Sequence, residues 1–234
     1  MKIALIGYGK MGKLIEAEAA RRGHETLLRL SSANNLGGAG LTKEVLAGID
    51  VCIDFSIASA VVEHIKRVVA AGKPIVVGTT GWSNELTAIK DYLVEHGGGL
   101  VYGSNFSFGM NVFFRIIREA TRLFATSDAY DVFMVEHHHK WKQDAPSGTA
   151  LVLQSILSQQ VPDRPCEIAC VRAGHAAGTH EITFDSEADT ITLTHMARNR
   201  GGFAAGAVAA AEWIVGKQGV YEFQDIIWGQ NGKD

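Results

Sequence analysis

The residues best suited to chemistry lie in one short segment, Glu136 to Thr149, which has the sequence EHHHKWKQDAPSGT. It combines imidazoles, which can donate a proton near neutral pH, with the ammonium group of Lys142. Ser147, Gly148 and Thr149 then lead into ALVLQSILSQ, a run of helical character. Free backbone N–H groups and the positive end of the helix dipole at such a start suit a carboxylate. The segment therefore predicts a catalytic centre for a small anionic substrate.

The three consecutive histidines of this segment also suggest a metal site, because imidazole is a common zinc ligand. Neighbouring residues of a strand point to opposite faces, so His137 and His139 could face together while His138 faces away. No matching cysteine or carboxylate pair completes a ligand set, and we expect no metal. A purely structural histidine cluster and an ordinary N-cap at Ser147 remain open as alternatives.

The first hundred residues must form the scaffold of a parallel sheet. Short apolar runs alternate there with segments of helical periodicity, which is the pattern of βαβ units. The expected strands are KIALI, ETLLRL, DVCIDF, PIVVGT and GLVYGS, and the expected helices are Lys10 to Arg22, SAVVEHIKRVVAAG and NELTAIKDYLVEHG. The predicted architecture is an α/β, Rossmann-type, doubly wound parallel sheet.

The pattern changes after about residue 108. MNVFFRIIREATRLFA predicts a long amphipathic helix, and AYDVFMVEHH predicts a strand that runs into the histidines. CEIACVRA, GTHEITFDS and DTITLTHMA are spaced as neighbouring strands of an open mixed sheet. The Ala-rich helix FAAGAVAAAEWIVG is apolar nearly all round and must be buried. We expect a dinucleotide-binding domain, 1–107 with 204–234, and an α+β substrate-binding and oligomerisation domain, 108–203.

A nucleotide site is predicted where Gly7, Gly9 and Gly12 form G-x-G-x-x-G between a strand and a helix. The first glycine allows a tight turn, the second lets a pyrophosphate approach the backbone, and the third lets helix and strand pack closely. Two later loops also follow predicted strands, although their compositions would serve ordinary turns equally well. The expected cofactor contacts are Gly7, Tyr8, Gly9, Lys10, Met11, Gly12, Gly78, Thr79, Thr80, Gly103, Ser104, Asn105 and Phe106.

The end of the second strand bears on the choice of cofactor. A site specific for NAD usually has an acidic residue there, which bonds the ribose 2′-hydroxyl. This chain has LLRLSSANN instead, with Arg29 and Lys10 near enough to meet a 2′-phosphate. We expect NADPH to be accepted alongside NADH, although the same residues could form only a solvated loop.

Composition and charge exclude several classes of partner. With 47% hydrophobic and 20% charged residues, the 234-residue chain has the composition of a globular protein. The net charge is −3, which gives no electrostatic footprint for nucleic acid or anionic membrane. No stretch approaches the roughly 18 apolar residues of a membrane helix. We expect a cytoplasmic protein with a small-molecule substrate, bound to neither nucleic acid nor membrane.

The segment EHHHKWKQDAPSGTA strongly resembles the signature of the 4-hydroxy-tetrahydrodipicolinate (dihydrodipicolinate) reductase family of bacterial lysine and diaminopimelate synthesis. The resemblance covers nearly the whole chain, because GYGKMG, VGTTG, SNFSFGMNV, RAGHAAGTHEITF, ITLTHMARNRGGFAAGA and GVYEFQDII follow the same order. It implies an enzyme that reduces 4-hydroxy-tetrahydrodipicolinate, a small dicarboxylate, with NADPH or NADH. It also implies a homotetramer.

By position, the resemblance makes His138 the proton donor and Lys142 its catalytic partner. It places substrate contacts at His139, Ser147, Gly148 and Thr149, the last two binding a substrate carboxylate. Two alternatives remain: a related amino-acid dehydrogenase, such as an aspartate or homoserine dehydrogenase, and a non-catalytic dinucleotide-binding redox sensor.

Overall fold

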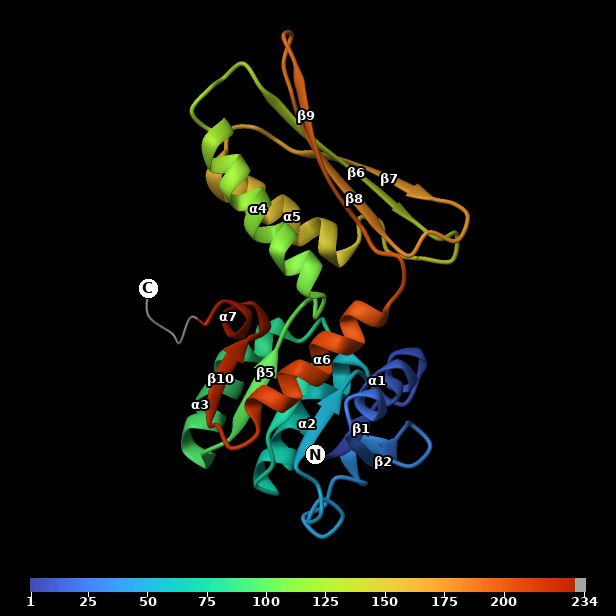
Figure 1. Cartoon of the computed structure of the whole chain (residues 1–234). Helices are drawn as coiled ribbons and strands as arrows, with labels where there is room; N and C mark the ends of the chain where they lie inside the picture. Colours follow the sequence, from blue (N-terminus) through green and yellow to red (C-terminus); the bar gives the residue numbers. More distant parts are fainter. Residues whose placement is uncertain (230–234) are drawn as a thin grey trace. The chain divides into compact units, whose positions relative to one another are not determined.

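The chain folds into two compact units in a computed structural model that describes residues 1–229 (Figure 1). Of the described residues, the first unit contains 1–107 and 201–229, and the second contains Phe108–Arg200. The sequence placed the return to the first unit at residue 204. The return occurs at Gly201 because helix α6 (Gly201–Ile214) begins with two glycines, which are poor helix formers and hide the helix start from a periodicity argument.

The first unit is built on a six-stranded, wholly parallel sheet. Its strands are β1 (Lys2–Ile6), β2 (Glu25–Leu30), β3 (Val51–Asp54), β4 (Ile75–Val77), β5 (Gly99–Tyr102) and β10 (Gly219–Glu222). They lie in the order β10-β5-β4-β3-β1-β2, so the order reverses between β1 and β3. The five predicted strands are all present, and β10 is a sixth that was not predicted. Open sheets of this type bind ligands outside the carboxyl ends of the strands at the reversal point.

Helices cover both faces of this sheet. They are α1 (Lys10–Arg21), α2 (Ala58–Ala70), α3 (Leu86–His96), α6 and α7 (Phe223–Trp228), with short 3₁₀ turns at Leu36–Gly38 and Ser83–Glu85. Alternate residues of β1 enter different cores: Ala4 and Ile6 pack with α2 and α3, while Ile3 and Leu5 pack with α1 and α6. The predicted doubly wound architecture is confirmed, and the predicted Ala-rich helix is buried as expected.

The second unit is a four-stranded mixed sheet with two helices on one face (Figure 1). Its strands are β6 (Asp131–His138), β7 (Glu167–Arg172), β8 (Thr179–Asp185) and β9 (Thr190–Met196), in the order β7-β6-β8-β9. Only the β6–β7 pairing is parallel, which confirms the predicted mixed sheet. Helices α4 (Phe108–Phe124) and α5 (Gly148–Gln160) bury the apolar side of β6.

Among residues 1–229, no helix is both long and apolar enough to span a membrane.

Candidate active site

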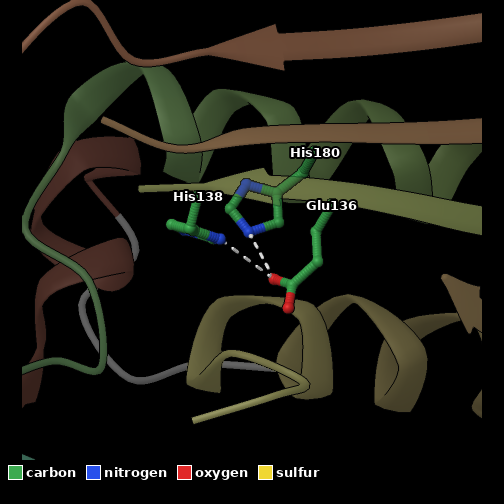
Figure 2. Close-up of side chains that lie close together, drawn as sticks. All are labelled: Glu136, His138 and His180. Carbon is green, nitrogen blue, oxygen red and sulfur yellow. Dashed lines mark ion pairs between the residues drawn. The ribbon is translucent and has the colours of Figure 1, made fainter. Parts of the chain in front are cut away.

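Strand register brings the chemically active side chains of the second unit together. Burial alternates along β6, so Glu136 and His138 are buried while His137 is exposed. Glu136 lies directly opposite His180 on β8, and His138 lies opposite Arg172 on β7. Figure 2 shows the rings of His138 and His180 both directed toward the Glu136 carboxylate. Three adjacent strands therefore build one cluster around a single carboxylate.

Glu136 is fully buried, and its two oxygens have different partners. Oε1 accepts hydrogen bonds from the Ser147 N–H at 2.9 Å and from Arg172 Nη2 at 2.5 Å. Oε2 lies 3.5 Å from His138 Nδ1 and 3.6 Å from His180 Nε2. Burial favours the neutral carboxyl, but the bonds from Arg172 and Ser147 outweigh it and lower the pKa of Glu136 to about 2. Glu136 is therefore an anion at neutral pH.

The two imidazoles have unequal environments. Burial lowers the pKa of His180 to about 4, and the neighbouring His138 ring acts in the same direction. Burial also lowers the pKa of His138, where the negative charge of Glu136 opposes the effect. His180 is therefore neutral at neutral pH, and burial is the largest cause of the lowered pKa at both rings.

A carboxylate overlooked in the sequence bears on the question of a metal. Possible ligand atoms of Glu136, His138 and His180 all lie within 4.8 Å of one another, because Glu136 shares a strand face with His138 and pairs with His180. From the sequence, no cysteine or carboxylate pair was expected to complete a ligand set around the three adjacent histidines. The guanidinium of Arg172 already neutralises this carboxylate, and a second cation there would meet its repulsion. The expectation of no metal therefore remains a prediction with a different physical basis.

The loop before α5 gives its polar groups different tasks. Ser147 is the N-cap of the helix, since its Oγ accepts the Ala150 N–H at 3.1 Å. Its hydroxyl also lies 3.2 Å from His180 Nε2, so Ser147 is committed to contacts within the protein. A side chain at Gly148 would meet no atom within 4 Å, which leaves the helix start open. Of the predicted substrate contacts here, Gly148 and Thr149 lie at that opening.

Lys142, predicted to supply positive charge, is paired with a neighbour. Its Nζ lies 2.7 and 2.8 Å from the two carboxylate oxygens of Asp144. Its charge nevertheless acts on His138, where it opposes protonation. His139, predicted to contact substrate, is half-buried and donates its N–H to the Ala176 carbonyl at 2.9 Å. The structure thus holds both residues in the loop that follows His138.

The glycine turn of the first unit meets the needs of a dinucleotide site. Gly7 has φ of +91°, and a Cβ there would lie 2.3 Å from the Phe55 carbonyl oxygen. A Cβ on Gly12 would lie 2.5 Å from the Gly7 carbonyl oxygen. At Gly9, by contrast, a Cβ would meet nothing within 4 Å, so packing does not require a glycine there. The open space at Gly9 fits the close approach of a pyrophosphate.

A cavity of about 310 Å³ lies beside this turn, at the carboxyl ends of β1, β3 and β4. Its walls include Met11 of the first predicted loop and Gly78, Thr79 and Thr80 of the second. Phe55, Ser56, Ile57 and Ala58, which the sequence did not single out, complete the lining. The volume is within the range of small-molecule sites. Two of the three predicted cofactor loops therefore meet at the reversal of the strand order.

The third predicted loop contributes mostly to the core. The Phe106 ring is 1% exposed and packs against Phe55 and Phe223, with centroids 5.9 and 4.6 Å apart. Asn105 is also buried, whereas Ser104 is exposed. The side chain of Phe106 is thus committed to packing, and only its backbone remains for the predicted cofactor contact.

The end of β2 carries a charge pair that was not foreseen from the sequence. Arg29 Nε donates to Glu16 Oε1 at 2.7 Å, and the Tyr8 hydroxyl donates to Glu16 Oε2. Asn34 turns its side chain back onto this strand end, donating to the Arg29 carbonyl at 3.1 Å. Arg29 is therefore held at the strand end with its charge partly offset. Glu16 places a carboxylate near the end of β2, where an NAD-specific site usually has an acidic residue and this chain has none.

A buried network under the cavity was also missed. Asp54 is fully buried, accepts hydrogen bonds from Ser56 and Thr79, and lies 2.7 Å from His64 Nδ1. Asn35 lies 3.2 Å from the other ring nitrogen of His64. The acidic residue near the end of the apolar run DVCIDF was the available signal. The network ties the loop after β2 to the cavity wall.

Gly178 gives a direct test of the geometry at His138. It has φ of +150°, and a Cβ there would lie 2.9 Å from His138 Nε2. We expect Gly178→Ala to displace the imidazole and lower kcat about 10²-fold. Gly174→Ala is the matched control, because Gly174 also has a positive φ (+58°) but a Cβ there would meet no atom within 4 Å. Equal kcat values for the two variants would contradict this prediction.

A doubly wound sheet with an open glycine turn at its reversal point, joined in one chain to a buried cluster of one carboxylate and two imidazoles, is typical of a nicotinamide-dependent oxidoreductase. Comparison with known proteins specifies the family. The model of the dihydrodipicolinate reductase N-terminus matches residues 1–106, and that of its C-terminus matches residues 109–227. The chain belongs to the dihydrodipicolinate reductase family.

Individual relatives agree with this assignment. The 4-hydroxy-tetrahydrodipicolinate reductase of Christiangramia forsetii is 35% identical over 97% of this chain and 98% of its own length. The enzyme of the same name from Acinetobacter baumannii is 34% identical over 97% of this chain and 96% of its own length. A dipicolinate-bound dihydrodipicolinate reductase from Paenisporosarcina sp. TG-14 has the same fold, with a TM-score of 0.78 and 21% identity over 97% of this chain and 99% of that one.

Proposed function

We propose that this chain performs the reaction of its family, the NAD(P)H-dependent reduction of 4-hydroxy-tetrahydrodipicolinate to tetrahydrodipicolinate in lysine and diaminopimelate biosynthesis, with His138 as the proton donor. The observation that carries the proposal is the buried His138 ring beside the Glu136 carboxylate, on the strand that leads to the open start of α5. A proton donor and an anion-binding helix start are what the reduction of a dicarboxylate needs.

Each residue of the site has a proposed task. The reaction releases the 4-hydroxyl of the substrate as water, and bound NADPH or NADH would supply the hydride to the conjugated ring that this loss leaves. His138 then donates a proton to the neighbouring carbon, since imidazole is a common general acid in proteins. Lys142 stabilises the negative charge that develops on the ring. Gly148 and Thr149 hold a substrate carboxylate at the start of α5, and His139 contacts the substrate.

The activity can be tested with freshly made substrate. A coupled assay with the preceding synthase, following nicotinamide absorbance, should show oxidation of both NADPH and NADH. Protein that binds NADPH but never oxidises it in this assay would instead be a redox sensor. Turnover of an amino acid but not of the dipicolinate precursor would favour a related dehydrogenase. We propose metal-free catalysis because the Arg172–Glu136 ion pair disfavours a second cation, and full activity after chelation is the expected result.

The Arg29–Glu16 ion pair at the end of β2 leads to a prediction about cofactor choice. Arg29→Ala would leave Glu16 without its cation, and that carboxylate would repel a 2′-phosphate. We expect kcat/KM with NADPH to fall about tenfold and kcat/KM with NADH to change little. Arg21→Ala is the control, since Arg21 pairs with Glu18 on the same helix but at its far end. A wild-type enzyme with a strong NADH preference, or an Arg29→Ala variant with equal losses for both cofactors, would refute this assignment.

The open face of the second sheet supports a proposed homotetramer. Phe133, Val171 and Met196 are 39%, 38% and 66% exposed. They lie on the same side of the sheet as the exposed His137. Apolar side chains gathered on one sheet face favour pairing with another copy. Light scattering during size-exclusion chromatography should give four times the chain mass, and Phe133→Glu should reduce it. We place the enzyme in the cytoplasm, with no nucleic-acid or membrane partner.

A further inference from the structure

One carboxylate links the proton donor of the second unit to its substrate-binding helix. Glu136 Oε1 accepts the backbone N–H of Ser147, the N-cap of α5, at 2.9 Å. Its Oε2 lies 3.5 Å from His138 Nδ1 and makes no hydrogen bond to a described residue, although it is buried. Burying a carboxylate oxygen without a hydrogen-bond donor costs free energy, so we expect this oxygen to have a partner or a function. Two imidazole nitrogens are near enough to satisfy it, His138 Nδ1 and His180 Nε2 at 3.6 Å, and the second already lies 3.2 Å from the Ser147 hydroxyl.

We infer that Glu136 is the positioning residue of this site: its carboxylate orients His138 through Nδ1 and fixes that ring to the start of α5 through Ser147. The inference rests on the proposed function, because it assigns Glu136 a task in the proton transfer from His138. It adds a residue that neither the sequence nor the family comparison assigned.

The carboxylate determines which nitrogen of His138 carries the mobile proton. An anionic Oε2 favours a proton on Nδ1, so the neutral ring keeps Nδ1–H and its Nε2 is free to gain and lose the second proton. Nε2 is the atom that faces Gly178, where the absent side chain leaves it room. The donor atom is therefore Nε2, and the 3.5 Å separation at Nδ1 should shorten when the ring is protonated.

Charges from every neighbouring element act on the same ring. The titratable or charged groups are Glu136 on β6, Cys170 and Arg172 on β7, His180 on β8, and Lys142 and Asp144 on the loop before α5; the Cys170 thiol acts on Glu136. Burial, Lys142 and Arg172 all favour neutral His138, and only the two carboxylates favour its protonated form. Asp144 is exposed and bound to Lys142. Glu136 is therefore the main group that keeps His138 able to act as an acid.

Glu136→Gln tests this assignment through the pH profile. The glutamine amide can present an N–H to Nδ1, which places the ring proton on Nε2 and disfavours the protonated ring. The pH above which kcat/KM falls should move down by about one unit, so the loss at about pH 8 should be some tenfold greater than at about pH 5.5. Arg172→Gln removes a positive charge, so the pH above which kcat/KM falls should move up.

The controls separate positioning from a structural role. Glu119→Gln removes a carboxylate that also pairs with an arginine, but at 58% side-chain exposure on α4, and it should leave the pH profile unchanged. A loss of kcat/KM that is equal at every pH in Glu136→Gln would overturn the inference. If that variant does not fold, an unshifted profile in Arg172→Gln would overturn it instead. Inactive wild-type protein would refute the proposed function itself, which keeps the two failures distinct.

Discussion

Replacing His138 by glutamine is expected to lower kcat by about 10²–10⁴-fold, the usual cost of removing a general acid. Glutamine has a similar reach and can still bond Glu136 Oε2, but it cannot deliver a proton to carbon. Because His138 lies in the second unit and the glycine turn in the first, cofactor affinity should be retained. Steady-state kinetics with fluorescence titration of NADPH would measure both quantities.

His137→Gln is the matched control for this change. It makes the same substitution one residue earlier, on the exposed side of β6, where the ring cannot reach the Glu136 cluster. Its kcat should stay within about twofold of wild type, as is usual for surface substitutions. Because His137 lies on the open sheet face, the oligomeric state of the His137→Gln variant should be measured together with its kinetics. An unchanged kcat in His138→Gln would exclude His138 as the acid.

The fold was predictable wherever burial leaves a local signature. Strands covered on both faces must be continuous apolar runs, so VCID of β3 and IVV of β4 were visible in the sequence. Strand β10 was not, because GVYE begins with glycine and none of its residues is fully buried. It joins the sheet only by pairing with β5, more than a hundred residues earlier in the chain. Such a pairing is set by the folded topology, not by the segment itself.

The site was predictable only where it is continuous in sequence. His138, Lys142 and Gly148 follow one another in the chain, and the signature of the family covers them all. Arg172 and His180 reach the same carboxylate from other strands. Both segments were predicted as strands, but the register that sets them opposite β6 cannot be known from either segment alone.

Alternation on β6 was a partial guide. It correctly separates His138 from His137, because adjacent strand residues face opposite sides. Applied one step further, it would also have placed Glu136 beside His138 and shown that the histidine has a carboxylate neighbour. In the same way, the helix start was predicted to be an anion site. Only the hydrogen bonds of Ser147 show that this residue serves as cap and anchor, and the space at Gly148 is where we propose that a ligand binds.

Lys142→Ala should reduce kcat/KM by about 10²–10³-fold, the cost of removing one preorganised group that stabilises developing charge. Both kcat and KM should be affected, because the ammonium attracts the anionic substrate as well as the transition state. Asp144 holds the Lys142 ammonium by two contacts of 2.7 and 2.8 Å, so the charge is preorganised in the free protein.

The pH profile of kcat/KM gives a second, independent test of Lys142→Ala. Lys142 opposes protonation of His138, so its loss should raise the pKa of His138 and move the alkaline fall of kcat/KM to higher pH. Lys140→Ala, two residues earlier, is the control: Lys140 is exposed, and its Nζ lies 4.9 Å from the Trp141 ring centroid. It should change neither rate nor profile. Intact kinetics in Lys142→Ala would remove Lys142 from the site, whereas a lower rate without the upward shift would place its charge away from His138.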